Sequence, residues 1–198
     1  MFGLDNLENR LIVGLGNPGV RYEATRHNVG FMTLDALMPD LACEATQYSR
    51  IRCEALVYEF TTKTGRIILA KPQTFMNHSG QSVKGLLKHY HVRAEELIVV
   101  HDDLDLPVGV LRIKTGGGCG GHRGVRSIID SCTEGFIRVK VGIGRPPGEI
   151  PPEDYVLQIM HTTALEELKV DAARAAGVVG AILKDGVLAA QNTFNAEG

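Results

Sequence analysis

The sequence predicts an α/β fold: a single three-layer domain over residues 1–198, with a mixed, mostly parallel twisted sheet flanked by helices. Short apolar runs of strand length alternate with longer patterns of helical period, which is typical of this class. The run 97–100 is apolar throughout, as expected for a central parallel strand. With 44% hydrophobic residues among 198, the chain can bury one sizeable core.

The N-terminal part of the chain is expected to form a strand, a helix and two further strands. A strand over 10–15 is predicted because an apolar run there ends in a glycine-rich turn. A helix over 27–38 follows, since its apolar residues recur at helical spacing. Strand-like runs then cover 51–60 and 66–71.

The central part continues the alternation. A helix over 78–91 carries one apolar stripe and precedes the strand over 97–101. A strand over 109–115 follows after a very short turn, so we expect these two strands to pair antiparallel, which makes the sheet mixed. A short helix containing Val125 and a strand over 136–143 come next.

The last part of the chain is expected to be helical. RPPGEIPP, at 145–152, is the one linker-like stretch of the sequence. The apolar stripe from Leu165 to Ile182 predicts a long helix after it. The segment beyond RPPGEIPP is too short to form a second domain.

Composition argues against a membrane or secreted protein. No apolar run approaches the ~20 residues that a spanning helix needs. The start, MFGLDNLENR, lacks the basic and apolar regions of a signal peptide. The four cysteines have no C-x-x-C spacing, so we expect reduced thiols rather than zinc ligands or disulfides, and a cytoplasmic location.

The net charge of −2 hides a strong asymmetry along the chain. Residues 107–148 hold seven Lys and Arg against two Asp and Glu, whereas residues 149–198 hold three against eight. A run of charge is often only a solvated surface. A basic stretch of this kind also suits a partner that carries phosphates.

The turn after the first strand matches a nucleotide-binding pattern. Gly14, Gly16 and Gly19 fit G-x-G-x-x-G, the dinucleotide fingerprint. In that fold a helix starts within the glycine turn, whereas here Pro18 interrupts the turn and residues 20–28 lack helical period. A nucleotide-dependent oxidoreductase therefore stays open only as an alternative.

Polar residues gather at four places where predicted strands end. These clusters are Asn17 with His27, residues 74–77, residues 101–105 and the glycine loop GGGCGGHRG at 116–124. Because the carboxyl ends of parallel strands share one edge of a sheet, we expect the four clusters to form one crevice.

Two other chemistries fit parts of these clusters. His101, Asp103 and Asp105 alternate along an extended segment, so all three could face one way and bind a metal. Against a metal site, the chain turns at once after Asp105, and no further His/Asp cluster completes a coordination shell. Cys119 lies near His122 and could be a nucleophile, although no group that activates or orients it can be identified.

In this order, the four clusters resemble the bacterial peptidyl-tRNA hydrolase family. The matching segments, between residues 11 and 146, are GLGNPGVRYEATRHNVG, KPQTFMNHSG, HDDLDLPVGVLRIKTGGGCGGHRG and RVKVGIGRP. The resemblance implies hydrolysis of the ester that joins a peptide to the 3′ ribose of tRNA. It also implies a monomer with no metal, organic cofactor or obligate protein partner. A non-catalytic RNA-binding relative of the same fold stays open as an alternative.

The resemblance implies roles around the reacting ester. His27 matches the catalytic histidine that takes a proton from water, and Asp102 matches the acid that holds this histidine in the working tautomer. Asn77 matches the amide that binds the peptide main chain and supports the oxyanion. Asn17 matches a second amide of the substrate groove.

The residues implied to bind substrate surround this centre. Lys114 and Lys140 fall where the family has basic residues that clamp a tRNA phosphate, and Arg138 lies on the same strand face as Lys140. Two residues depart from the family pattern. Lys140 stands where many members have Arg, and it keeps the charge but not the bidentate geometry. Arg123 stands where many members have Asn, so it either contacts RNA or leaves the amide function to another residue. The groove residues on the peptide side are Tyr22, Phe75 and Met76.

Overall fold

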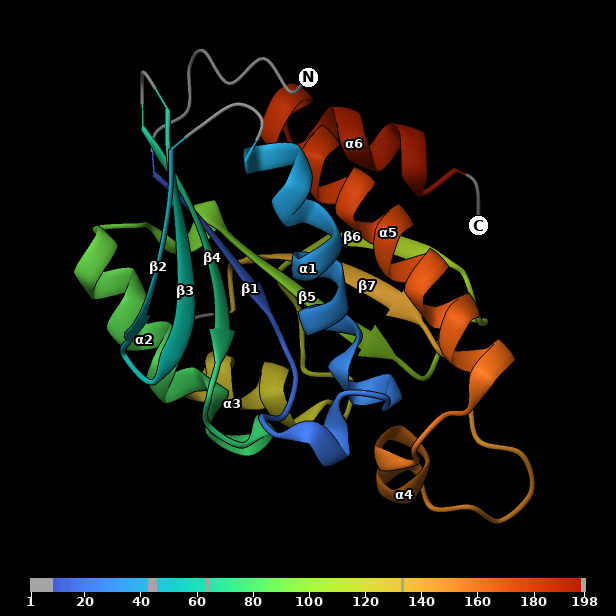
Figure 1. Cartoon of the computed structure of the whole chain (residues 1–198). Coiled ribbons are helices and arrows are strands. Elements are labelled where there is room, and N and C mark those ends of the chain that lie inside the picture. Colours follow the sequence, from blue (N-terminus) through green and yellow to red (C-terminus); the bar gives the residue numbers. More distant parts are fainter. Residues whose placement is uncertain (1–8, 43–45, 63–64, 133, 197–198) are drawn as a thin grey trace.

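A computed structural model describes residues 9–42, 46–62, 65–132 and 134–196. The chain forms a seven-stranded sheet with helices packed on both faces (Figure 1). The strand order is β2-β3-β4-β1-β5-β7-β6. The predicted α/β class, with three layers and a mixed sheet, is confirmed.

The four central strands run parallel and are buried along almost their whole length. They are β4 (Arg66–Pro72), β1 (Arg10–Gly14), β5 (Leu97–Asp103) and β7 (Ile137–Gly142). Their carboxyl ends therefore lie at one edge of the sheet. The outer strands, which pair antiparallel, are β2 (Thr46–Arg52), β3 (Ala55–Thr61) and β6 (Leu111–Thr115).

Residues 51–60, predicted as one strand, belong to the two strands of a hairpin. The chain reverses at Cys53 and Glu54, which have φ values of 49° and 55°. Positive φ at both central residues is what a two-residue hairpin turn of the right twist requires. The sequence has no Asn-Gly or Asp-Gly at this position, so the apolar pattern alone could not reveal the turn.

The expected antiparallel pair between 97–101 and 109–115 is wrong. β6 pairs with β7, and β7 lies between β5 and β6. β7 is buried along almost its whole length, whereas the last residues of β6 are exposed. The more apolar strand therefore takes the inner position and β6 forms the edge. The sheet is still mixed, because β6 runs antiparallel to β7.

Two groups of helices cover the sheet (Figure 1). Both faces are closed by separate apolar cores. The predicted C-terminal helical region divides at Gly186, and none of the helices in the described ranges is both long and apolar enough to cross a membrane. One face carries α1 (Val29–Ala42), α5 (Thr162–Asp185) and α6 (Val187–Phe194), and the other carries α2 (Ser79–Tyr90) and α3 (Arg123–Ser131).

A short helix that the sequence did not reveal, α4 (Pro152–Leu157), forms at the end of the RPPGEIPP stretch. Proline suits this helix start because the first N–H groups of a helix have no partner within it. Arg26 lies over the ring of Tyr155 at 4.0 Å, and the Tyr155 hydroxyl donates to the carbonyl of Ile143 at 3.0 Å. These contacts hold α4 beside the carboxyl edge of the central strands (Figure 1).

The glycine loop reaches this carboxyl edge by a route that the sequence did not predict. Because β6 is antiparallel, Thr115 lies at the opposite edge of the sheet. The chain then returns through the loop to His122. Buried Arg138 on β7 fixes the path by donating hydrogen bonds to the carbonyls of Gly117 and Gly118, the latter at 2.6 Å.

Candidate active site

A cleft of about 650 Å³ opens at the carboxyl edge of the central strands. All four predicted polar clusters contribute to its lining, together with α4. Of the residues predicted to form the site, all but Lys114 line this cleft. The predicted residues in the lining are Asn17, Tyr22, His27, Phe75, Met76, Asn77, Asp102, Arg123, Arg138 and Lys140.

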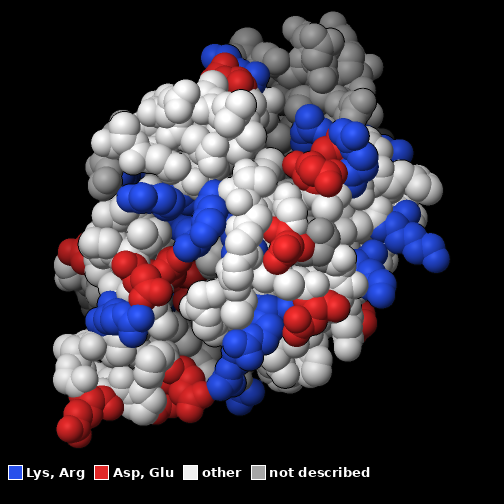
Figure 2. All heavy atoms as spheres, turned by 180° about the vertical axis from the view of Figure 1, so that it is seen from behind, with Lys and Arg blue, Asp and Glu red and all other residues white. Residues whose placement is uncertain are grey.

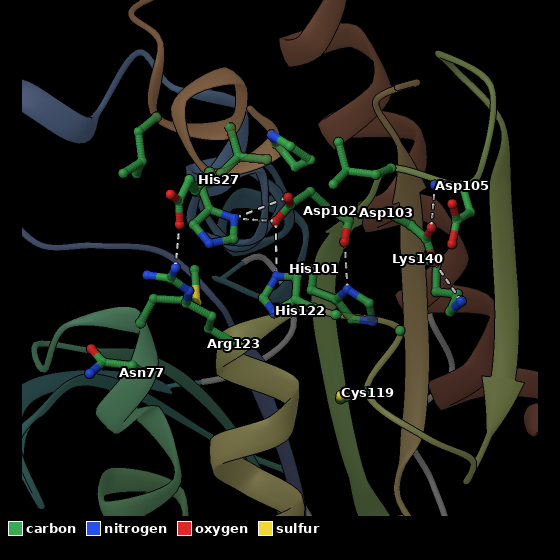
Figure 3. A pocket seen from close by; sticks show the side chains of 18 of the residues that line it. His27, Asn77, His101, Asp102, Asp103, Asp105, Cys119, His122, Arg123 and Lys140 are labelled. Atoms are coloured by element: carbon green, nitrogen blue, oxygen red, sulfur yellow. Dashed lines mark hydrogen bonds and ion pairs between the residues drawn. The ribbon is translucent and has the colours of Figure 1, made fainter. Parts of the chain in front are cut away.

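His27 and Asp102 meet in a buried hydrogen bond on one side of the cleft (Figure 3). His27 lies on the 3-10 turn Arg26–Asn28, and Asp102 lies near the end of β5. Nδ1 of His27 is 2.9 Å and 3.0 Å from the two carboxylate oxygens. Since a carboxylate only accepts, Nδ1 carries the proton, and Nε2 keeps a lone pair that can take a proton from water.

His122 is a second partner of Asp102, and sequence reasoning missed this contact. Its Nε2 lies 3.0 Å from Oδ1 of Asp102. Its Nδ1 caps α3 by accepting from the N–H groups of Gly124 and Val125, at 3.1 Å and 3.2 Å. A nitrogen that accepts twice carries no hydrogen, so Nε2 is the donor to Asp102. The one signal in the sequence was the position of His122 just before a helix, where histidine is an uncommon cap.

Two histidine rings flank the carboxylate of Asp102 and set its charge state, and a third, His101, lies against its backbone. Burial alone would raise the pKa of Asp102, but the neighbouring His27 and His122 outweigh it and hold that pKa well below its usual range. His101 packs edge to face on His122, with ring centroids 4.8 Å apart, and its Nδ1 donates to the carbonyl of Asp102 at 2.7 Å. Burial, with His122 nearby, lowers the pKa of His101 to about 3. Asp102 is thus an anion at pH 7, and the neighbouring His101 is neutral.

Asn17 ties two of the site loops together. Its side-chain oxygen accepts from the backbone N–H of Met76 at 2.9 Å, and the residue lines the cleft. The side chain of Asn28, also unnoticed in the sequence, binds both the N–H and the carbonyl of Asn17, at 2.8 Å and 3.0 Å. Asn17 is not among the residues with positive φ, so a left-handed turn does not explain its presence.

Asn77 lies exposed at the rim of the same cleft, on a 3-10 turn before α2 (Figure 3). Its amino group donates to Nε2 of His78 at 3.2 Å. The residue at the N-cap of α2 is His78, whose side chain makes no capping hydrogen bond, and the N–H of Gly80 in the first turn donates to the hydroxyl of Ser127 at 2.9 Å. Asn77 is therefore not a helix cap, and its amide is available to a ligand.

The predicted basic residues differ in their surroundings. Lys140 pairs with Asp103 at 2.5 Å, and Arg123 pairs with Glu153 of α4 at 2.5 Å. Arg138 is buried and holds the glycine loop, as described above. Lys114 stands beside Arg138 in the sheet register but outside the cleft.

The metal site suggested by His101, Asp103 and Asp105 is not assembled. Asp103 pairs with Lys140, Asp105 pairs with Arg145, and Nδ1 of His101 is held by a backbone carbonyl. Within the described ranges, the ligand atoms that do converge are those of His27, Asp102 and His122, within 4.8 Å of one another. The short distances from the nitrogens of His27 and His122 to the oxygen of Asp102 are those of the two hydrogen bonds described above.

Cys119 does not form a dyad with His122. A hydrogen bond from Arg126, helped by the Gly121 N–H, lowers the pKa of its thiol. Both nitrogens of His122 are already engaged with Asp102 and the start of α3. The thiol therefore lacks the adjacent base that a nucleophilic mechanism needs.

Two of the three glycines of the G-x-G-x-x-G pattern serve close packing, whereas Gly19 has open space around it and a φ of 104°. A Cβ at Gly14 would lie 2.2 Å from the carbonyl oxygen of Gly30, and one at Gly16 would lie 2.8 Å from the ring of Phe31. After this turn the chain forms the 3-10 turn Val20–Tyr22 instead of a helix whose N-terminus faces the turn. The geometry required for a dinucleotide pyrophosphate is not formed here.

Comparisons with known proteins agree with the site. The family model for peptidyl-tRNA hydrolase matches residues 11–198. A peptidyl-tRNA hydrolase from Rubrobacter xylanophilus is 48% identical over 184 residues, which is 93% of this chain and 99% of that one. One from Rhodococcus erythropolis is 45% identical over 189 residues, covering 95% and 98%.

Solved structures give the same result. The crystal structure of peptidyl-tRNA hydrolase from Acinetobacter baumannii superposes with a TM-score of 0.84 at 34% identity, covering 94% of each chain. A 5′-methylthioadenosine/S-adenosylhomocysteine nucleosidase from Helicobacter pylori shares the fold alone, with a TM-score of 0.57 at 8% identity. The matches of sequence and structure, over almost the whole chain, show that this protein belongs to the peptidyl-tRNA hydrolase family.

Proposed function

We propose that this protein hydrolyses the ester between a peptide and the 3′ ribose of tRNA, with His27 as general base. The observation that carries the proposal is the buried bond from Nδ1 of His27 to Asp102, which leaves Nε2 facing the cleft. Family membership supports the reaction and the substrate class.

The proposed reaction needs one proton acceptor and one anion binder. Nε2 of His27 takes a proton from water while the oxygen attacks the ester carbonyl. Asp102 stabilises the imidazolium that forms, and its carboxylate keeps the ring in place. The tetrahedral intermediate then collapses, the 3′ oxygen of the ribose leaves, and His27 returns the proton to it. The products are a peptide with a free carboxylate and a tRNA with a free 3′ hydroxyl.

Two amides are proposed to bind the acyl group. The side-chain oxygen of Asn17 is bound by the N–H of Met76 and its loop is fixed by Asn28, so its amino group is proposed as a preorganised donor to the developing oxyanion or to the peptide. Asn77, at the rim, is suited to bind the peptide main chain. A site that hydrogen-bonds a peptide group rejects a substrate that lacks one, which would protect aminoacyl-tRNA. The side chains proposed to pack against the peptide are Tyr22, Phe75 and Met76.

The basic residues are proposed to hold the tRNA. Lys140 and Lys114 supply cations on the sheet face that carries α3, and Arg138 shapes the glycine loop between them. Arg123 reaches the cleft from the start of α3. Figure 2 shows basic and acidic side chains interspersed when the molecule is seen from behind, without one continuous basic field. Binding should therefore depend on a few local phosphate contacts and fall as salt rises.

The experiment that tests the function is incubation with N-acetyl-aminoacyl-tRNA in the presence of a chelator. We expect release of the acylated amino acid, because the proposed chemistry uses no metal or organic cofactor. His27→Ala should abolish release and leave folding and tRNA binding nearly intact. A protein that binds tRNA but releases nothing would be a non-catalytic RNA-binding module instead. Monomeric state and cytoplasmic location stay predictions.

A further inference from the structure

The cleft as a whole carries no net charge. Its described lining contains four cations, Arg123, Arg138, Lys140 and Arg145, and four anions, Asp102, Asp103, Asp105 and Glu153. A polyanion such as tRNA gains little from a neutral surface unless some carboxylates release their cations. Phosphates should therefore bind where a cation can leave its carboxylate partner and pair with a phosphate instead.

Two of these cations are held by acids at the end of β5 and just after it. Nζ of Lys140 lies 2.5 Å from Oδ2 of Asp103, and the two side chains are only 22% and 12% exposed. Arg145 pairs with Asp105, and these side chains are 70% and 58% exposed. Since water and salt screen an exposed pair, the Arg145 pair is the easier one to exchange.

The backbone before Arg145 is fixed to the edge of the cleft. The N–H of Ile143 donates to the carbonyl of Asp103 at 3.0 Å, and the N–H of Gly144 donates to the carbonyl of Leu106 at 2.9 Å. A guanidinium that projects from a fixed backbone can change partners by side-chain rotation alone. Arg145 therefore needs no loop movement to exchange a carboxylate for an external anion.

We propose that Arg145 binds a phosphate at the 3′ end of tRNA, and that Asp105 holds it in the free protein until the phosphate replaces the carboxylate. This inference rests on the proposed function. A phosphate offers the planar guanidinium two oxygens, as a carboxylate does, and forms a strong charge-assisted pair. Figure 3 shows Asp105, Asp103 and Lys140 grouped on the side of the cleft away from Asn77, so Lys140 supplies a second cation there.

The test is the affinity of the full-length chain for deacylated tRNA over a series of KCl concentrations. Asp105→Asn should bind about three- to tenfold more tightly at low salt, with a salt slope steeper by about one. Arg145→Gln should bind about three- to tenfold more weakly than the wild type. The double variant, Asp105→Asn with Arg145→Gln, should bind tRNA as weakly as Arg145→Gln alone. Removing the carboxylate cannot raise affinity when the cation that it held is already gone.

A matched control separates a local contact from a change of total charge. Glu166 of α5 forms a similarly exposed pair with Lys169, outside the cleft. Glu166→Gln changes the net charge by the same amount as Asp105→Asn and should leave affinity within about twofold. Equal effects of these two variants, or a gain that survives in the double variant, would overturn the Arg145 site.

Hydrolysis by the wild type distinguishes this inference from the proposed function. If the wild type cleaves N-acetyl-aminoacyl-tRNA while Asp105→Asn gains no affinity, the Arg145 site alone is overturned. If the wild type neither cleaves this substrate nor binds tRNA, both proposals are overturned.

Discussion

Nε2 of His122 lies 3.0 Å from the same oxygen of Asp102 that Nδ1 of His27 approaches to 2.9 Å. The two imidazoles differ in whether a ring nitrogen is available to accept a proton. Both nitrogens of His122 have partners, whereas Nε2 of His27 faces the cleft. A carboxylate held from two directions cannot turn away from His27 when water enters. His122 is therefore a positioning residue that acts through Asp102.

We predict that His122→Ala lowers kcat roughly 10- to 100-fold, because a small misplacement of the general base is costly. The variant should also lose about 1 kcal/mol of stability, since the N–H groups of Gly124 and Val125 lose their cap. Steady-state hydrolysis of N-acetyl-aminoacyl-tRNA and urea unfolding measure the two effects.

A second substitution at this position separates the two functions of the side chain. Serine is a favoured helix cap but is too short to reach Asp102. His122→Ser should therefore regain most of the stability and none of the activity. Activity that returns together with the cap would show that His122 matters only for α3.

Much of the site could be predicted because single residues carried strong local signals. Asn17 and His27 follow β1, Asp102 lies near the end of β5, and the parallel sheet brings the carboxyl ends of these strands together. The long apolar patterns fixed the type of most elements, since periodicity depends only on neighbouring residues. Membership of the family followed from the same segments.

The parts that could not be predicted depend on contacts between distant segments. Nothing local to His122 shows that its ring reaches Asp102, because the return of the glycine loop is set by Arg138 on another strand. In the same way, the place of β7 between β5 and β6 reflects relative burial and not chain order. The turn at Cys53 and Glu54 lacked the usual turn residues.

We predict that Arg138→Met weakens tRNA binding by loosening the glycine loop. The buried guanidinium donates to the carbonyls of Gly117 and Gly118, and methionine would leave both without this partner. KM should rise several-fold with a smaller change in kcat, and amide hydrogen exchange should speed up over 116–121. Normal loop exchange together with weaker binding would instead indicate that Arg138 contacts phosphate directly.

We predict that His101 makes the protein less stable in acid. Burial lowers the pKa of His101 to about 3, whereas an unfolded histidine has a pKa near 6.5. Between these values the unfolded state binds the extra proton, so the free energy of unfolding falls as pH drops through this window. The loss should reach about 2–3 kcal/mol at pH 4.5.

The matched variant for this effect is His101→Asn, whose side-chain amide can replace the hydrogen bond from Nδ1 to the carbonyl of Asp102. Urea unfolding at pH 7 and pH 4.5 should show a smaller acid loss in the variant than in the wild type. An equal loss in both proteins would mean that other groups cause the acid sensitivity.

We predict that Cys119 is alkylated faster than Cys132. A hydrogen bond from Arg126, together with the Gly121 N–H, lowers the pKa of the Cys119 thiol, whereas burial raises that of Cys132. Because the thiolate is the nucleophile, iodoacetamide near pH 7.5 should label Cys119 first, as peptide mass spectrometry would show. Since Cys119 lines the cleft, labelling should also block hydrolysis. Arg126→Gln should slow the labelling of Cys119 and leave Cys132 unchanged, and equal rates in both proteins would remove Arg126 from this explanation.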